Sequence, residues 1–333
     1  MQHIFIVNNA AGNGKVSEKL ISQIRDYFGK NGGNYKIEFT KYKGDATNIA
    51  RRYAKTGGPV RIYSCGGDGT LNETVNGIVG YDNVERGIVP CGSGNDFIAS
   101  ICGEKNEYFL NVKAQTEGES VRADLLRIDD GLYAINQVSM GFDAKVVDNF
   151  AKFKNKLNIS GKTAYILSVL YTLAGNISNE MSVEIDGVPA PKERLLLSIA
   201  GNGKFQGGGM MSVPDADPFS REICVMTVKN VPKTRFFSLF PGYMKGEHKK
   251  YADIVSMVGC QTVKMTAAKP IPVTYDGEIL VTESVTVSVV PEAVKIILPN
   301  VAAAKQGGKR EMLQKGAFGK KIKKFEKIFP NLL

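Results

Sequence analysis

Histidine is scarce in this chain of 333 residues, which contains only His3 and His248. A Ser-His-Asp hydrolase requires a histidine beside its nucleophile, so that class is disfavoured, and a structural zinc site with histidine ligands is excluded for the same reason. The five cysteines include no C-x-x-C pair and are odd in number. We therefore expect reduced, semi-buried thiols in a cytoplasmic protein.

Long apolar runs are missing as well. The longest, residues 164–174, falls far short of the roughly 20 residues that a helix needs to cross a bilayer. The first residues, Met1–Val7, carry no basic leader or cleavage site and favour a first β-strand. With 43% hydrophobic residues, the chain has enough apolar side chains for a large core and enough length for two domains. The sequence thus predicts a soluble two-domain protein.

The standard nucleotide-binding motifs are also absent. No G-x-x-x-x-G-K-S/T pattern occurs, because Gly12-Asn13-Gly14-Lys15 has the wrong spacing. The segment Gly92–Phe97 ends in phenylalanine where a G-x-G-x-x-G motif needs a glycine. Both standard nucleotide folds are therefore disfavoured, although glycine-rich turns are present.

The most informative of these turns is Gly66-Gly67-Asp68-Gly69-Thr70, between an apolar run at residues 60–63 and a helix-like segment at residues 71–78. Glycine tolerates positive φ and leaves no Cβ in the way of a ligand, and a helix N-terminus attracts anions. This pattern favours phosphate binding over the alternative, a plain tight turn. Two more turns, residues 8–14 and 91–97, follow predicted strands, and in a parallel sheet all three should face one crevice.

The order of predicted elements indicates an α/β fold. Residues 1–122 alternate between strands and helices, which is typical of a parallel nucleotide-binding α/β domain, and Asp45 is the expected N-cap of one helix. Residues 123–300 consist mostly of short β-type runs between Gly/Pro/Asp turns, which predicts a mostly antiparallel β-sandwich domain. A cleft between the two domains is the default ligand site. The predicted strands are 3–7, 35–42, 60–64, 86–90, 124–128, 132–138, 181–185, 195–200, 223–229, 263–266, 271–275, 285–289 and 294–298, and the predicted helices are 16–28, 45–55, 164–173 and 236–245.

The positive charge is concentrated at the C-terminus. The net charge is +10, and residues 301–333 hold nine Lys or Arg against Glu311 and Glu326, so the body is nearly neutral and nucleic acid is not an expected partner. Phe318, Ile322 and Phe325 have helical spacing, which indicates a basic amphipathic tail. Such a tail is suited to peripheral binding at the inner face of the membrane, but its apolar side chains could equally pack on the body.

The segment Asp276-Gly277-Glu278, like the basic tail, has two interpretations. An Asp-Gly pair between β-runs is the ordinary signal of a hairpin turn, and this interpretation is favoured by the local sequence alone. Phosphoryl transfer, however, needs a carboxylate that accepts the proton of the nucleophile, in addition to donors and a divalent ion at the phosphates.

Gly66–Glu73, taken together with Gly92–Phe97, resembles the bacterial diacylglycerol kinase family of lipid kinases. The first motif is shared with the related NAD kinases and 6-phosphofructokinases, and the second indicates the lipid branch. The resemblance extends over residues 1–298. It implies an ATP-dependent lipid kinase in which Asp276 is the general base, with Glu278 and Asp68 as further catalytic residues. The implied ATP-binding residues are Asn8, Asn9, Ala10, Ala11, Gly12, Thr40, Gly66, Gly67, Asp68, Gly69, Thr70, Glu73 and Ser93, and Asn95 and Asp96 line the substrate cleft.

The resemblance also implies Mg²⁺ bound with ATP, whereas the positions that hold a structural magnesium in relatives are not matched in this chain. Relatives carry an Asp-Gly after Pro214-Asp215-Ala216, where this chain has Ser220–Cys224, and Arg221 could replace that charge. Ile98-Ala99-Ser100 stands where relatives often have Ala-Arg, so the identity of the acceptor lipid is open. A second copy of the chain, in a homodimer, is the further partner that we consider. The alternatives to a lipid kinase are a kinase of a soluble acceptor such as NAD or a polyol, and a non-catalytic nucleotide- or lipid-binding protein.

Overall fold

The computed structural model describes residues 1–11, 15–102, 107–129, 131–157 and 161–303. Gly12 and nearly all of the basic tail lie outside the described residues. The chain forms two compact units, residues 123–293 and the remainder, which consists of residues 1–122 and the segment from Val294 onward. Two strands, β5 (Glu119–Ile128) and β14 (Glu278–Leu298), contribute residues to both units.

The first unit contains a parallel sheet in the order β4-β3-β1-β2. Its strands are β1 (Gln2–Val7), β2 (Asn34–Phe39), β3 (Val60–Gly66) and β4 (Val84–Pro90). The last residues of β14 join this sheet, since Lys295 and Ile296 pair in parallel with Glu85 and Arg86 of β4. The carboxyl ends of β1, β3 and β4 therefore lie at one edge of the sheet.

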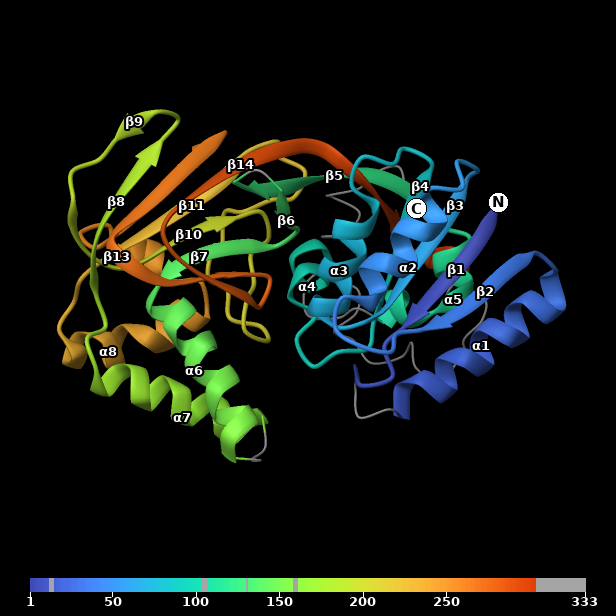
Figure 1. The fold of residues 1–333 in the computed structure, drawn as a ribbon, viewed down its shortest axis with the longest axis horizontal. Helices are drawn as coiled ribbons and strands as arrows, with labels where there is room; N and C mark the ends of the chain where they lie inside the picture. The colour runs from blue at the N-terminus through green and yellow to red at the C-terminus, as the bar shows by residue number, and fades with distance from the viewer. Residues whose placement is uncertain (12–14, 103–106, 130, 158–160, 304–333) are drawn as a thin grey trace. The chain divides into compact units, whose positions relative to one another are not determined.

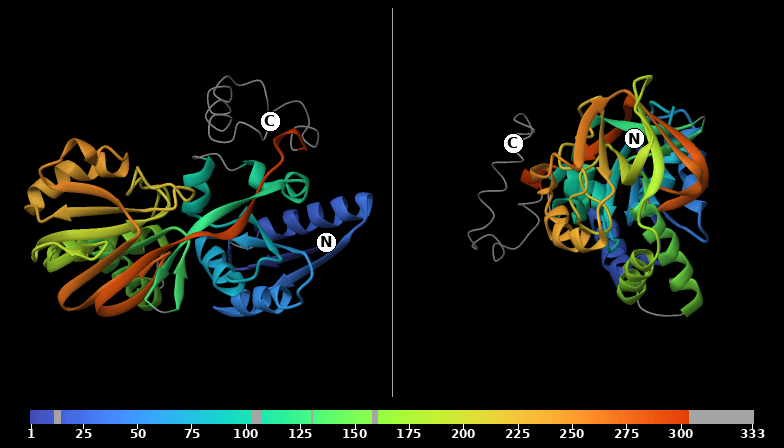
Figure 2. Two further views of the ribbon diagram at one scale, coloured as in Figure 1. Left: turned by 90° about the horizontal axis from the view of Figure 1, so that it is seen from above. Right: turned by 90° about the vertical axis from the view of Figure 1, so that its left-hand side faces the viewer.

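Helices cover both faces of this sheet, as Figure 2 shows for α1 and α2. Alternate residues of β1 account for this arrangement, because successive side chains of a strand point to opposite faces. Ile4 and Ile6 pack in a cluster with residues of α2, whereas Phe5 and Val7 pack in another with residues of α1. The helices of the unit are α1 (Lys15–Asn31), α2 (Asp45–Ala54), α3 (Asp68–Ile78), α4 (Asp96–Cys102) and α5 (Val112–Thr116), with a short 3₁₀ helix at Glu107–Leu110.

The second unit is mostly antiparallel, so the predicted fold class is confirmed. Strands β12, β11, β10, β7, β13 and β14 follow one another in the sheet, and β8 pairs with both β10 and β13. Two pairs of predicted strands are in fact single long strands, β13 and β14, with a register shift in β13 after Thr266. The remaining bounds are β6 (Leu132–Ala134), β7 (Gln137–Gly141), β8 (Asn179–Ile185), β9 (Val188–Pro189), β10 (Glu193–Gly201), β11 (Ile223–Lys229), β12 (Val255–Cys260) and β13 (Thr262–Tyr275).

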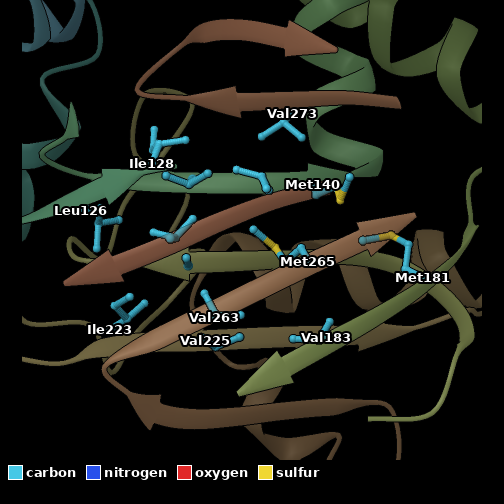
Figure 3. Packing of buried hydrophobic residues seen from close by; sticks show 14 of the residues in the cluster. Leu126, Ile128, Met140, Met181, Val183, Ile223, Val225, Val263, Met265 and Val273 are labelled. Atoms are coloured by element: carbon cyan, nitrogen blue, oxygen red, sulfur yellow. The ribbon is translucent and has the colours of Figure 1, made fainter. Parts of the chain in front are cut away.

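The strands β10 and β11 separate two cores. In β11, Ile223 and Val225 pack among buried side chains of the other strands (Figure 3). Met226 and Val228 face the opposite way, toward three helices that lie together on that side (Figure 1). These are α6 (Phe142–Leu157), α7 (Gly161–Ala174) and α8 (Lys233–Met244), followed by a 3₁₀ turn at His248–Lys250.

Two local expectations change. Asp45 is not the N-cap of α2: the cap is Gly44 at φ 88°, and Asp45 opens the helix while its Oδ2 accepts the backbone N–H of Lys41 at 2.8 Å. Helix α6 has no counterpart among the predicted elements. Within the described residues, no helix combines the length and the apolar character that crossing a membrane would require.

Candidate functional site

Hydrogen bonds join the loops that follow β1, β3 and β4. The backbone N–H of Asn8 donates to the Cys65 carbonyl at 3.0 Å, and that of Cys91 donates to the Gly66 carbonyl at 2.8 Å. The Asn8 side chain also donates to Thr70 Oγ1 at 3.0 Å. The three turns therefore form one continuous surface, at which α3 begins with Asp68.

The glycines of this surface are required by close packing. A Cβ on Gly66 would lie 2.3 Å from Thr70 Oγ1, and one on Gly92 would lie 2.3 Å from the Cα of Gly67. Gly67 itself has an extended backbone, with φ −95° and ψ −167°. The missing side chain, rather than left-handed backbone, thus explains why glycine occupies these positions.

Asp68 holds the two glycine turns together. Its Oδ2 accepts the backbone N–H of Asn95 at 2.7 Å, and its Oδ1 accepts that of Asp96 at 2.9 Å. Burial raises the pKa of Asp68 above its usual range, while the backbone donors oppose this shift. The carboxylate therefore orients the loop after β4.

The other predicted ATP-binding residues occupy varied places in this unit. Asn9, Ala10 and Ser93 are exposed on the loops after β1 and β4. Thr40 follows β2 and donates its N–H to the Val7 carbonyl at 3.0 Å. Glu73 lies one turn into α3, and its carboxylate accepts the N–H groups of Gly44 and Ala46 at the start of α2. The roles of these residues, and that of Ala11, stay predictions.

Asp276 belongs to the second unit, in the turn between β13 and β14. Both Asp276 and Gly277 have positive φ, 48° and 89°, as a type I′ hairpin turn requires. The Asp276 carboxylate accepts three backbone N–H groups, from Ile135 at 2.7 Å and from Asn136 and Gln137 at 3.0 Å each. The hairpin interpretation is therefore correct for the backbone, and the same turn ties the carboxylate to the start of β7. Glu278 opens β14 opposite Tyr275.

Asn136 is a neighbour of Asp276 whose role the sequence did not reveal. Its side chain is 7% exposed, and its Nδ2 donates to the Phe205 carbonyl at 2.8 Å. Its Oδ1 is buried and makes no hydrogen bond within the described chain, and the same holds for Thr274 Oγ1. Buried acceptors without a partner commonly mark a place where a ligand or water binds.

The carboxylates of Asp68 and Asp96 are those that could hold a Mg²⁺ ion accompanying ATP. A Cβ on Gly94 would lie 2.6 Å from an oxygen of Asp68 and 3.6 Å from an oxygen of Asp96, so both carboxylates border the loop. Mg²⁺ at phosphates commonly takes one or two carboxylates and keeps several waters. The described residues contain no cluster of His, Cys, Asp or Glu able to hold a metal alone.

Arg221 is the residue whose charge could replace that of a structural magnesium. It donates its backbone N–H to Asp124 Oδ2 at 2.7 Å, and its guanidinium pairs with Glu292.

Comparison with known proteins accounts for both units. Residues 2–128 match the diacylglycerol kinase catalytic domain, and residues 136–298 match the YegS C-terminal NAD kinase beta sandwich-like domain. A diacylglycerol kinase of Bacillus subtilis is 25% identical over 280 residues, which cover 84% of this chain and 90% of the relative. A solved structure of a diacylglycerol kinase from Bacillus anthracis has a TM-score of 0.65 at 19% identity, covering 91% of this chain and 98% of the other.

The structural likeness, at that identity, shows the fold alone, whereas the two matching domains together extend over most of the sequence. The chain therefore belongs to the bacterial diacylglycerol kinase-like family of lipid kinases.

Proposed function

We propose that this protein is an ATP-dependent lipid kinase that transfers the γ-phosphoryl group of ATP to a hydroxyl group of diacylglycerol or a related lipid. The observation that carries the proposal is the junction of the three loops at the start of α3. Membership of a kinase family supports it. In this proposal the first unit binds the nucleotide, and the second provides the base and binds the acceptor.

The phosphates of ATP would bind at the glycine turns. The backbone N–H groups at the start of α3 and the helix dipole both favour negative charge there. Mg²⁺, held by Asp68 and Asp96, would neutralise charge on the phosphates. The absence of side chains at Gly66, Gly67 and Gly92 lets the loops pack closely enough to present these donors.

Asp276 would accept the proton of the lipid hydroxyl as its oxygen attacks the γ-phosphorus and ADP leaves. The three backbone donors fix the position of the carboxylate. Asn136 Oδ1, buried beside it, is an acceptor that could orient the hydroxyl before transfer. The base and the group that positions the acceptor thus come from one turn and from the segment before β7 to which that turn is bonded.

The second unit offers a matched control for Asp276. Asp186 also precedes a glycine in a hairpin turn, has the same φ of 48°, and uses Oδ1 to accept the N–H groups of Gln261 and Thr262. We expect Asp276→Asn to lower kcat about 100-fold or more, and Asp186→Asn to retain activity. Activity is measured as phosphate transfer from radiolabelled ATP to lipid vesicles, and thermal melting of both variants shows whether they stay folded. Normal turnover by Asp276→Asn would contradict the assignment of Asp276 as the general base.

Replacing Asp68 tests the donor site. Asp68→Ala removes both acceptors of the loop after β4, so we expect ATP binding and turnover to be lost while the chain stays folded. A total lipid extract, compared with NAD and polyols as acceptors, tests the acceptor class. Label on a soluble acceptor alone would contradict a lipid kinase, and ATP binding without any transfer would indicate a non-catalytic binding protein.

A further inference from the structure

An apolar cavity of about 120 Å³ lies within the second unit. It is enclosed by the helix-covered face of β10 and β11 together with α6, α7 and α8. Side chains such as Val146, Val169, Val228, Phe236 and Phe240 form its wall, which is almost entirely apolar. A wall of this composition favours a hydrocarbon ligand over a sugar or a nucleotide, because polar groups without partners are costly to bury.

A few polar side chains stand together in this wall. Asp143 is half-buried, its Oδ2 lies 3.5 Å from the side-chain nitrogen of Gln206, and it accepts the Ser139 hydroxyl at 2.5 Å. The Gln206 side chain also donates to the Tyr243 hydroxyl at 3.0 Å. Burial raises the pKa of Asp143, so this carboxyl is costly to keep ionised in an apolar surrounding.

His248 adds a second polar group to the cavity. It is 3% exposed, it lies beside Tyr243 with ring centroids 5.1 Å apart, and neither ring nitrogen makes a hydrogen bond within the described chain. Backbone groups of Ser212 and Tyr243 lie near the ring, but their positions do not meet the geometry of a hydrogen bond. Burial lowers the pKa of His248, so a neutral ring with a donor and an acceptor borders the cavity.

One strand and one loop connect this cavity with Asp276. The strand is β7, whose first residue, Gln137, donates to Asp276 and whose end leads directly into Phe142 and Asp143. Its five residues span about 17 Å. The loop begins at Gly203, which accepts the Gln137 side chain at 2.7 Å, and continues to Gln206 in the cavity wall. Both connections lie inside the second unit.

The helices of the cavity also present apolar side chains to the outside. On α7, Leu170 is 53% and Tyr171 is 62% exposed, while Val169 lines the cavity. On α8, Phe237 is 57% exposed beside the buried Phe236. Exposed apolar groups over such a cavity suit a surface from which a lipid enters.

We propose that this cavity binds one acyl chain of a lipid, and that Asp143, Gln206 and His248 bind a hydrogen-bonding group carried near that chain, such as an ester or a hydroxyl. That this lipid is the acceptor rests on the proposed function, and the reacting hydroxyl would then lie toward Asp276. The polar groups make the cavity selective for an amphiphile over a plain hydrocarbon chain.

Binding can be measured without turnover because the chain contains no tryptophan. Phe240→Trp places a single indole in the cavity wall, and its emission is followed during titration with monopalmitoylglycerol in the absence of ATP. In this background, Val169→Phe fills the cavity and should weaken binding at least tenfold. Val188→Phe makes the same change at a position that is 70% exposed on β9, and should bind normally. Equal affinity of the two variants would overturn the proposal.

The polar group is tested by comparing two probes. Asp143→Leu and Tyr243→Phe, which removes the hydroxyl bonded to Gln206, should lower the affinity for monopalmitoylglycerol several-fold more than that for hexadecane, which has neither an ester nor a hydroxyl. An affinity ratio that is unchanged in both variants would refute the polar contacts. Tyr243→Phe removes a single oxygen atom, so it keeps the test valid if Asp143→Leu fails to fold. If the native chain phosphorylates lipids but Val169→Phe does so equally well, the cavity proposal alone fails. If the native chain binds the probe but phosphorylates no lipid, the proposed function fails instead.

Discussion

At the residue scale, three aspartates show how one local geometry permits different tasks. Asp68, Asp186 and Asp276 all accept backbone N–H groups through their carboxylates, and the last two have the same turn conformation. Hydrogen bonding alone therefore does not separate a structural aspartate from a catalytic one. The surroundings differ: within the described residues, Asp276 is the one of the three that is bonded to a segment containing the buried acceptor Asn136 Oδ1, which supports the proposal that it is the base.

The glycines of the first unit give a prediction at the same scale. An alanine Cβ at Gly92 would lie 2.3 Å from the Cα of Gly67, and backbone on both sides leaves little room to relax. We expect Gly92→Ala to destabilise the protein by about 1–3 kcal/mol, the range of overpacking, and to weaken ATP binding. Urea unfolding and ATP titration measure the two effects.

Gly69 provides the control within the same surface. It lies in the first turn of α3, and a Cβ there would meet no atom within 4 Å. Gly69→Ala should therefore leave stability unchanged, or raise it by up to about 1 kcal/mol through helix propensity. If Gly69→Ala keeps its stability but loses ATP affinity, the phosphates themselves need that space. If Gly92→Ala unfolds at the same urea concentration as the native chain, close packing is not the reason for that glycine.

At the element scale, the two Asp-Gly hairpins allow turn strain to be separated from catalysis. Gly277 has φ 89° and Gly187 has φ 79°, and neither position is crowded. Alanine at either should cost about 1 kcal/mol, because an L-residue is strained there. Only Gly277→Ala should also lower phosphoryl transfer, since it disturbs the turn that holds Asp276. Melting temperatures and kcat are compared, and an equal loss of kcat in both variants would count against a special role for the β13–β14 turn.

Most elements could be predicted from local patterns, and the exceptions have physical causes. Helix α6 escaped prediction because it follows β7 directly, with no loop between Gly141 and Phe142 to separate the strand from the helix. Strands β13 and β14 are each predicted as two strands because prolines and polar residues interrupt their apolar runs. In the structure, pairing of β13 with β14 and with β8 keeps the strands continuous across these interruptions. Pairing between distant segments has no signature in a local window, so the parallel contact of Lys295 with β4 could not be foreseen.

The candidate site was only partly accessible to sequence reasoning. The convergence of the three loops follows from the rule that parallel strands end at one edge, and hydrogen bonds confirm it. That Asn136 lies next to Asp276, and that Asp143, Gln206 and His248 line one cavity, could not be found this way, because these residues come from separate strands, loops and helices. Only the folded chain brings such residues together.

At the scale of the whole molecule, charge rather than fold suggests how the protein would meet its lipid. The net charge is +10, and the segment from Lys305 to Lys327 contains nine basic residues and two acidic ones. A nearly neutral body with one strongly basic segment should be attracted to anionic bilayers through that segment, at about 1 kcal/mol per basic residue near the surface. This attraction would add to any contact made by the exposed apolar side chains of α7 and α8.

Shortening the chain by residues 304–333 tests this attraction and keeps Val301 and Ala303, which are buried. We expect weaker sedimentation with vesicles that contain anionic lipid and a smaller response to salt, because screening acts mainly on exposed charges. Changing Lys320, Lys321, Lys323 and Lys324 to glutamine should reproduce most of the loss if charge is responsible. If instead the apolar residues of the tail dominate, the glutamine variant will bind as the native chain does, at every salt concentration. Turnover of a lipid dispersed in detergent should be the same in all three chains, since no charged surface is then involved.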